Sequence, residues 1–185
     1  MDEILDDLYP PFSGVIKTVL RRMVQLGSPM RITRGLVSFS EQREVYLIGR
    51  GAPEVFYSDK PKTPNKVVTY SKPGFSNHHW GIAVDCCFMG KDPFLEHDFE
   101  SFKKWSNFGR VSKEEGCAWG GDWSRVVDKP HVERLHGFTL TSLRQMFEKG
   151  GLCLIWSQFD KALGINGTWE ASKVDALSKR VGEIL

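Results

Sequence analysis

Hydrophobic and polar positions in the first fifty residues predict a helix, a strand and a second helix. Between Ser13 and Leu26, apolar residues recur every three or four positions, which is the period of a helix with one buried face. Residues 30–37 have the pattern of a strand. Ser38, followed three positions later by Glu41, has the spacing of a capping box and predicts a helix that continues to about Ile48.

The middle of the chain combines an irregular segment with a second strand. Residues 51–77 are rich in proline, lysine, serine and glycine, and predict a long loop that is either a wall of a substrate groove or a surface insertion. The run Ile82–Phe88 is typical of a strand that turns Val84 and Cys86 towards the core. Asp85 then lies on the opposite face, where burial of a carboxylate is costly unless a cation or a hydrogen-bond donor accompanies it.

The C-terminal half is predicted to be mainly helical. A helix begins near Asp98 and places an aromatic stripe in the core, formed by Phe99, Phe102, Trp105 and Phe108. A second helix is expected at Thr139–Lys149, ending at Gly150. After a compact apolar segment, the last amphipathic helix carries Val174, Leu177, Val181 and Ile184.

Composition narrows the protein classes that fit this pattern. A chain of 185 residues with 41% hydrophobic residues can bury one substantial core. A net charge of +2 does not favour nucleic acid as a partner. The chain has no run of eighteen apolar residues and starts with an acidic segment, so we expect no stable membrane insertion and no signal peptide.

Without a signal peptide, we expect the protein to be made and kept in the cytoplasm, where cysteines stay reduced. No Cys-x-x-Cys pair occurs, and adjacent Cys86 and Cys87 point to opposite faces of the predicted strand. We therefore expect reduced thiols at Cys86, Cys87, Cys117 and Cys153.

Two segments about fifty residues apart concentrate side chains that bind metals. The first contains His78 and Asp85, and the second contains His131 with Asp128 three positions before it. Two imidazoles and one carboxylate suit zinc with an open fourth position, although manganese or cobalt are expected to substitute in vitro. Because Pro130 removes a backbone donor and restricts Lys129 to extended conformations, Asp128 and His131 are expected on a stiff, non-helical stretch. By contrast, we expect ordinary core or surface roles for His79, His97 and His136.

These segments resemble a known family. The patterns Ser-x-His-x-x-Gly-x-Ala-x-Asp, Trp-Gly-Gly-Asp-Trp and Asp-x-Pro-His-x-Glu are similar to those of zinc peptidases that cut peptidoglycan stem peptides. The narrower resemblance is to the L-alanyl-D-glutamate endopeptidase branch, which includes many bacteriophage endolysins and relatives of the D-alanyl-D-alanine carboxypeptidases. It covers roughly residues 10–137, including the lead-in segments 32–42 and 46–50.

The resemblance implies a fold and a site. The fold is α+β: a small, mostly antiparallel sheet with flanking helices, as in Hedgehog and D,D-peptidase domains, over residues 1–150, followed by a helical extension at 151–185. The implied zinc ligands are His78, Asp85 and His131, and Asp128 is the catalytic carboxylate that takes a proton from the attacking water. Supporting or substrate-binding roles fall to Ser76, Arg34, Arg43, Trp119 and Asp122, with a simple turn role as the alternative for Ser76.

One position departs from the family pattern. Family members commonly carry an arginine where this chain has Val37, and valine can neither bind substrate ions nor stabilise an oxyanion. Loss of such a donor costs roughly 100-fold in turnover. A nearby arginine, namely Arg34, Arg43 or Arg50, is expected to replace it. The alternatives are stabilisation by the metal alone or a weak enzyme.

The main hypothesis is a monomeric phage-type endolysin that hydrolyses the L-alanyl-D-glutamate bond of peptidoglycan after release from the cytoplasm. A D-alanyl-D-alanine carboxypeptidase and a non-catalytic, zinc-stabilised wall-binding protein are the alternatives. For residues 151–185, packing on the core and wall binding both stay open.

Overall fold

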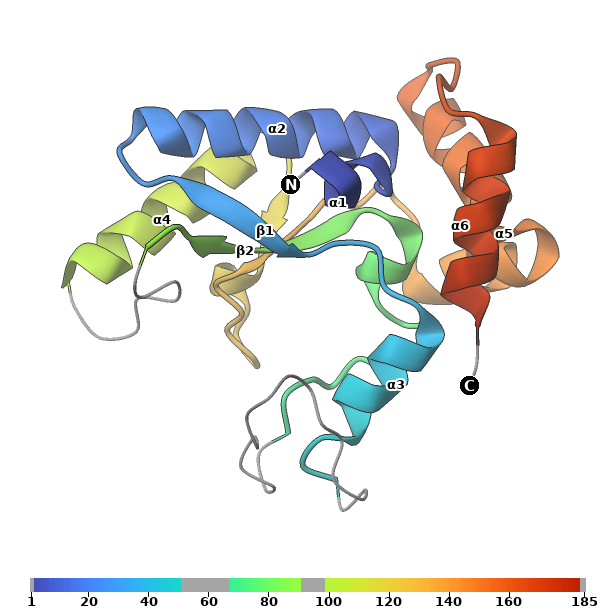
Figure 1. Cartoon of the computed structure of the whole chain (residues 1–185), viewed down its shortest axis with the longest axis horizontal. Helices are drawn as coiled ribbons and strands as arrows, with labels where there is room; N and C mark the ends of the chain where they lie inside the picture. The colour runs from blue at the N-terminus through green and yellow to red at the C-terminus, as the bar shows by residue number, and fades with distance from the viewer. Residues whose placement is uncertain (1, 51–66, 91–98, 184–185) are drawn as a thin grey trace. The chain divides into compact units, whose positions relative to one another are not determined.

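The structure is a computed structural model that describes residues 2–50, 67–90 and 99–183 (Figure 1). The chain divides into two compact units. Unit 1 comprises residues 1–36 and 80–137, and unit 2 comprises residues 37–79 and 138–185. Most of the expected 51–77 loop, together with His97 and Ile184, lies outside the described residues.

Unit 1 contains a four-stranded antiparallel sheet in the order β1-β2-β4-β3. Its strands are β1 (Met30–Arg34), β2 (Ala83–Phe88), β3 (Ala118–Trp119) and β4 (His131–Glu133). Its helices are α1 (Asp2–Asp6), α2 (Pro10–Gln25), α4 (Phe99–Glu114) and the short 3-10 helix η2 (Gly120–Asp122). The α+β class with a small antiparallel sheet is confirmed.

The core of unit 1 forms between the long helices and the sheet. The helical period predicted for residues 13–26 corresponds to α2, which buries Phe12, Ile16, Val19 and Met23. In α4, Trp105 and Phe108 are buried as expected, but Phe102 is 64% exposed, so its predicted place in the core was wrong. A three-residue spacing drifts around a helix with 3.6 residues per turn, and this drift carries Phe102 towards the surface.

Unit 2 is helical in its described part. It contains α3 (Phe39–Leu47), the start of the 3-10 helix η1 (Asn77–Trp80), α5 (Leu140–Leu163) and α6 (Ala171–Gly182). The capping box of Ser38 and Glu41 is present at the start of α3. The predicted break at Gly150 is confirmed, because Gly150 and Gly151 are non-helical, yet the chain resumes a helix that continues to Leu163.

Two further expectations concern membrane-spanning helices and the state of the cysteines. Within residues 2–50, 67–90 and 99–183, no helix has both the length and the apolar character needed to cross a membrane. The four cysteines are free, and Cys86, Cys87 and Cys117 are buried.

Candidate metal centre and active site

His78 lies in η1, at the junction that leads into β2. The backbone N–H of His79 donates to the carbonyl of Ser76 over 3.1 Å and closes the turn that contains His78. His78 itself is only 4% exposed. The backbone of Ser76 thus takes part in a turn, and both roles considered for its side chain stay predictions.

The neighbouring His79 anchors this turn within unit 2. Its Nδ1 lies 2.7 Å from the carbonyl oxygen of Val37, and its Nε2 accepts a hydrogen bond from the backbone N–H of Gly74 over 3.1 Å. Because Nε2 is the acceptor, Nδ1 carries the hydrogen and donates it to Val37. His79 is fully buried and has the structural role expected of it.

Asp85 and His131 meet across the sheet. They are directly opposed in the antiparallel pairing of β2 with β4, so their side chains lie on the same face. The Nδ1 atom of His131 lies 3.0 Å from Oδ1 of Asp85. Strand pairing thus joins two of the three side chains that the sequence predicted as ligands.

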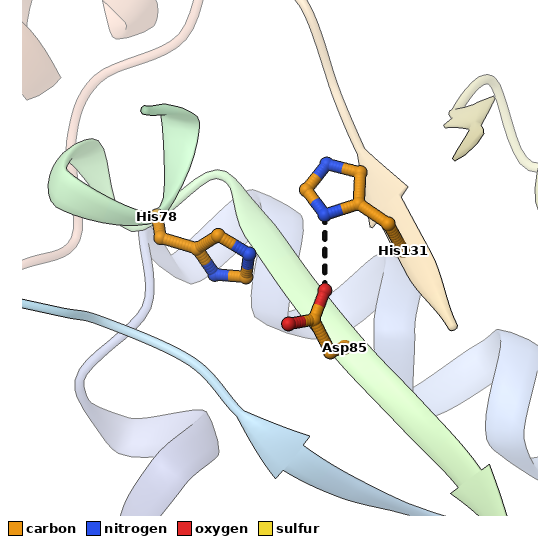
Figure 2. Close-up of side chains that lie close together, drawn as sticks. All are labelled: His78, Asp85 and His131. Carbon is orange, nitrogen blue, oxygen red and sulfur yellow. Dashed lines mark hydrogen bonds and ion pairs between the residues drawn. The ribbon is translucent and has the colours of Figure 1, made fainter. Parts of the chain in front are cut away.

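Figure 2 shows His78, Asp85 and His131 pointing towards one another. One ligand atom from each residue lies within 4.8 Å of the others. Two imidazoles and one carboxylate form the donor set of a zinc site that keeps a fourth position for water or substrate. The three residues that the sequence predicted as ligands are therefore brought together.

The electrostatics of this cluster favour a cation. Burial opposes a charged His131, but hydrogen bonds to Asp85 and Glu133 and the charges of these carboxylates outweigh it and raise the pKa of His131 to about 10. A site that holds a proton so strongly has the negative potential that attracts a divalent metal ion. The residues present therefore fit zinc.

Asp128 is brought towards His131 by a tight turn. Its backbone N–H donates to the carbonyl of Gly120 over 2.9 Å, and its carbonyl accepts from the backbone N–H of His131 over 3.2 Å. A Cβ atom on Gly120 would lie 2.4 Å from the Asp128 carbonyl oxygen and 3.0 Å from Cβ of His131. A glycine is therefore required where η2 packs against this turn.

A β-bulge places Arg34 on the face of Asp85. The pairing of β1 with β2 changes register between Ile32 and Arg34, so that Arg34 lies opposite Asp85. Without the bulge, Arg34 would share the face of Ile32 and Cys86. The bulge therefore turns an arginine towards the metal-binding face, a role that bulges often have beside active sites.

The other two candidate arginines, Arg43 and Arg50, lie in unit 2 with Val37. Val37 is 3% exposed and belongs to the core. Arg43 is exposed on α3. Arg50 lies beyond the end of α3, where it donates to the carbonyl of Thr69 over 2.8 Å and stacks on the ring of Tyr46.

Trp119 and Asp122 line a cavity of about 730 Å³ beside α4. The indole Nε1 of Trp119 donates to the carbonyl of Lys129 over 2.7 Å, and Asp122 forms an ion pair with Lys113. The bond from Trp119 to Lys129 fixes the position of the residue next to Asp128, whereas the ion pair joins η2 to α4. Roles in substrate binding stay predictions for both residues.

Sequence reasoning missed two residues that surround His131. The ring of Trp123 lies 4.9 Å from the His131 ring, and Oε2 of Glu133 lies 3.1 Å from His131 Nε2. Both belong to motifs already singled out, Trp-Gly-Gly-Asp-Trp and Asp-x-Pro-His-x-Glu. The two-residue period of a strand gives the signal for Glu133, because it places residues 131 and 133 on one face.

Comparison with known proteins supports the same site. Residues 69–134 match a peptidase M15 family model described as D-alanyl-D-alanine carboxypeptidase. The chain is 30% identical over 135 residues to the peptidoglycan L-alanyl-D-glutamate endopeptidase CwlK of Bacillus subtilis (strain 168). The matched region covers 70% of this chain and 74% of that relative. The chain belongs to the peptidase M15 family. It is accordingly a zinc-dependent peptidase, and the matched region contains the whole His-Asp-His cluster.

Solved structures show weaker similarity. The L-Ala D-Glu endopeptidase ChiX of Serratia marcescens is 24% identical, with a TM-score of 0.47, over 72% of this chain and 85% of that chain. The vancomycin-resistance D,D-dipeptidase VanXYg, solved with a D-Ala-D-Ala phosphinate analogue, is 18% identical, with a TM-score of 0.42, over 75% of this chain and 58% of that chain. The family assignment rests on the Bacillus relative.

The arrangement has the parts required for hydrolysis of an amide. His78, Asp85 and His131 would hold the zinc ion of this M15 peptidase. When bound, zinc supplies Lewis-acid chemistry, because it polarises a carbonyl group and makes water a stronger acid. Asp128 lies three residues before His131 and is only partly exposed, and its role as the catalytic carboxylate stays a prediction.

Proposed function

We propose that this M15 peptidase hydrolyses peptidoglycan stem peptides at the L-alanyl-D-glutamate bond. The main support is the similarity to an L-alanyl-D-glutamate endopeptidase over about three quarters of that relative's length. The site residues are His78, Asp85 and His131 as zinc ligands and Asp128 as the proton acceptor. The opposition of Asp85 and His131 in the sheet supports the ligand set, and the backbone turn that joins Asp128 to His131 supports the role proposed for Asp128.

The experiment is digestion of purified murein by the zinc-loaded protein, followed by mass spectrometry of the new amine groups. Fragments with N-terminal glutamate are expected. Activity should disappear on chelation and return with zinc. Asp128→Asn should abolish turnover yet keep the zinc content, whereas His131→Ala should lose both. Unchanged hydrolysis by Asp128→Asn would remove Asp128 from the mechanism.

A second candidate is a D-alanyl-D-alanine carboxypeptidase. The description of the family model that matches residues 69–134 favours it. The same digestion separates the two functions, because a carboxypeptidase releases free D-alanine and leaves no N-terminal glutamate.

The biological setting that we propose is that of a phage endolysin. The motifs of the two metal-binding segments, which resemble those of many endolysins, support it. The enzyme would accumulate in the cytoplasm and reach the wall after the inner membrane is permeabilised. Expression in a bacterial host should cause rapid lysis only when a membrane-permeabilising agent is added. Lysis without that agent would contradict this setting.

A further inference from the structure

We propose that Glu133 is a positioning residue that orients His131 to bind zinc through Nδ1. This inference rests on the proposed zinc site and does not depend on which bond the enzyme cuts. Glu133 closes the Asp-x-Pro-His-x-Glu motif, and the proposed reaction assigns it no role.

The strand places Glu133 beside His131. The two residues are separated by one position in β4, so their side chains leave the same face of the sheet. In the pairing with β2, Glu133 lies opposite Ala83 and His131 lies opposite Asp85. The small side chain of Ala83 leaves Glu133 room on this face, while His131 meets a carboxylate.

The two ring nitrogens of His131 face different partners. Nδ1 lies 3.0 Å from Asp85 Oδ1, inside the group of prospective zinc ligands, and Nε2 lies 3.1 Å from Glu133 Oε2. Each nitrogen faces a carboxylate oxygen, which accepts, so each nitrogen donates a hydrogen while no metal is bound. A metal ion held together with Asp85 and His78 would take the place of the hydrogen on Nδ1, whereas Nε2 keeps the hydrogen that it donates to Glu133.

Burial makes this arrangement persistent. The side chains of His131 and Glu133 are 8% and 13% exposed, and the ring of Trp123 lies against that of His131. Little water can compete for Nε2 in such surroundings, and a charge-assisted hydrogen bond gains strength as water is excluded. A carboxylate that fixes the imidazole in this way also increases its basicity towards the metal.

The test is the zinc affinity of Glu133 variants, measured by competition with a chromophoric chelator. Glu133→Ala should lower the affinity 10- to 100-fold, the usual effect of removing such a partner. Glu133→Gln should lower the zinc affinity less than Glu133→Ala does, because the amide oxygen still accepts a hydrogen bond from Nε2 of His131. The matched control is Glu115→Gln, another partly buried carboxylate of unit 1 that pairs with Arg22 instead. Its affinity should equal that of the wild type.

A second measurement identifies the nitrogen itself. In the zinc-loaded wild type, nitrogen-15 NMR of the His131 ring should show the hydrogen on Nε2 and the metal on Nδ1. This measurement requires no peptidase activity, so its result does not depend on whether the proposed substrate is correct. It uses the wild-type protein and can therefore be made even if Glu133→Ala does not fold.

Three results would overturn the proposal. The first is a hydrogen on Nδ1 in the zinc-loaded protein. The second is a loss of affinity in Glu133→Gln as large as that in His131→Ala, which would make Glu133 a ligand. The third is unchanged zinc affinity with lost turnover in both Glu133 variants, which would assign Glu133 to proton transfer.

Discussion

At the scale of single residues, Val37 occupies a position whose burial does not suit an arginine. Its side chain is 3% exposed, and its carbonyl accepts the hydrogen bond that orients His79. We expect Val37→Arg to destabilise the zinc-loaded protein by about 3 kcal/mol or more, because a guanidinium would enter an apolar core without a partner. Urea denaturation measures this loss. Higher turnover at unchanged stability would show that the position tolerates the family residue.

Arg34 is the arginine that the β-bulge turns towards Asp85. We predict that it stabilises negative charge developing on the substrate. Arg34→Ala should then lower turnover about 100-fold and leave the zinc affinity within a factor of a few. Arg21→Ala, on an exposed face of α2, is the control and should keep full turnover. Equal turnover in the Arg34 and Arg21 variants would leave oxyanion stabilisation to the metal or to another arginine.

His136 gives a pH dependence of stability. Burial, together with the charge of Arg134, lowers the pKa of His136 from 6.5 to about 4, and its ring packs edge-on against Tyr9. The unfolded chain takes up this proton near pH 6.5 and the folded chain only near pH 4. The contribution of His136 to the free energy of unfolding is therefore fully present above pH 6.5 and is lost as the pH falls towards 4.

The variant His136→Phe keeps a ring beside Tyr9 and removes the titration. Between pH 7 and pH 4.5, the unfolding free energy of the wild type should fall by about 1–2 kcal/mol more than that of the variant, a figure reduced for partial exposure of the ring. Chemical denaturation of the metal-free proteins at both pH values provides the comparison. Parallel stability curves would contradict the assignment.

At the scale of elements, the site depends on the contact between η2 and the turn that precedes β4. We expect Gly120→Ala to displace the turn of Asp128 and His131 away from η2, because the new methyl group would lie 2.4 Å from the Asp128 carbonyl oxygen and 3.0 Å from Cβ of His131. The predicted result is a loss of about 1–3 kcal/mol of stability and at least a 10-fold loss of turnover. Denaturation and murein digestion measure the two effects.

The control for this change is Gly14→Ala in α2, where an added Cβ meets nothing within 4 Å. This variant should gain about 0.5–1 kcal/mol, because alanine favours a helix over glycine. Wild-type activity in Gly120→Ala would show that the turn accommodates the methyl group.

At the scale of the whole molecule, residues 151–185 provide a large part of the core of unit 2. Leu152, Ile155, Trp156 and Phe159 are all at most 2% exposed. Trp156→Ala should therefore cost about 3–5 kcal/mol, whereas Leu163→Ala, at 37% exposed, should cost under 1 kcal/mol. Urea denaturation compares the two. Equal costs would mean that these residues form a separable appendage.

The division expected from the sequence, a catalytic domain at 1–150 with an extension at 151–185, stays a proposal, as does wall binding by the extension. Sedimentation of the intact protein with murein sacculi, with and without exposed substitutions such as Ile165→Glu, would check the wall-binding role. Monomeric behaviour likewise stays a prediction, and size-exclusion chromatography with light scattering would test it.

The sequence by itself determined the local elements and the chemistry of the site. The capping box, the helical period of α2 and the apolar alternation of β2 act between neighbours in the chain, so residue types alone reveal them. The identities of His78, Asp85 and His131 indicated zinc because ligand preference is a property of the side chains.

Only the tertiary structure decided how these groups meet. The opposition of Asp85 and His131, the bulge that turns Arg34 and the enclosure of His131 by Glu133 and Trp123 depend on strand register and on packing between distant segments. The alternation within β2 indicates the face on which Asp85 lies, but which residue of β4 stands opposite it depends on pairing between segments far apart in the sequence. The sequence therefore predicts which residues are ligands, whereas the fold determines their geometry.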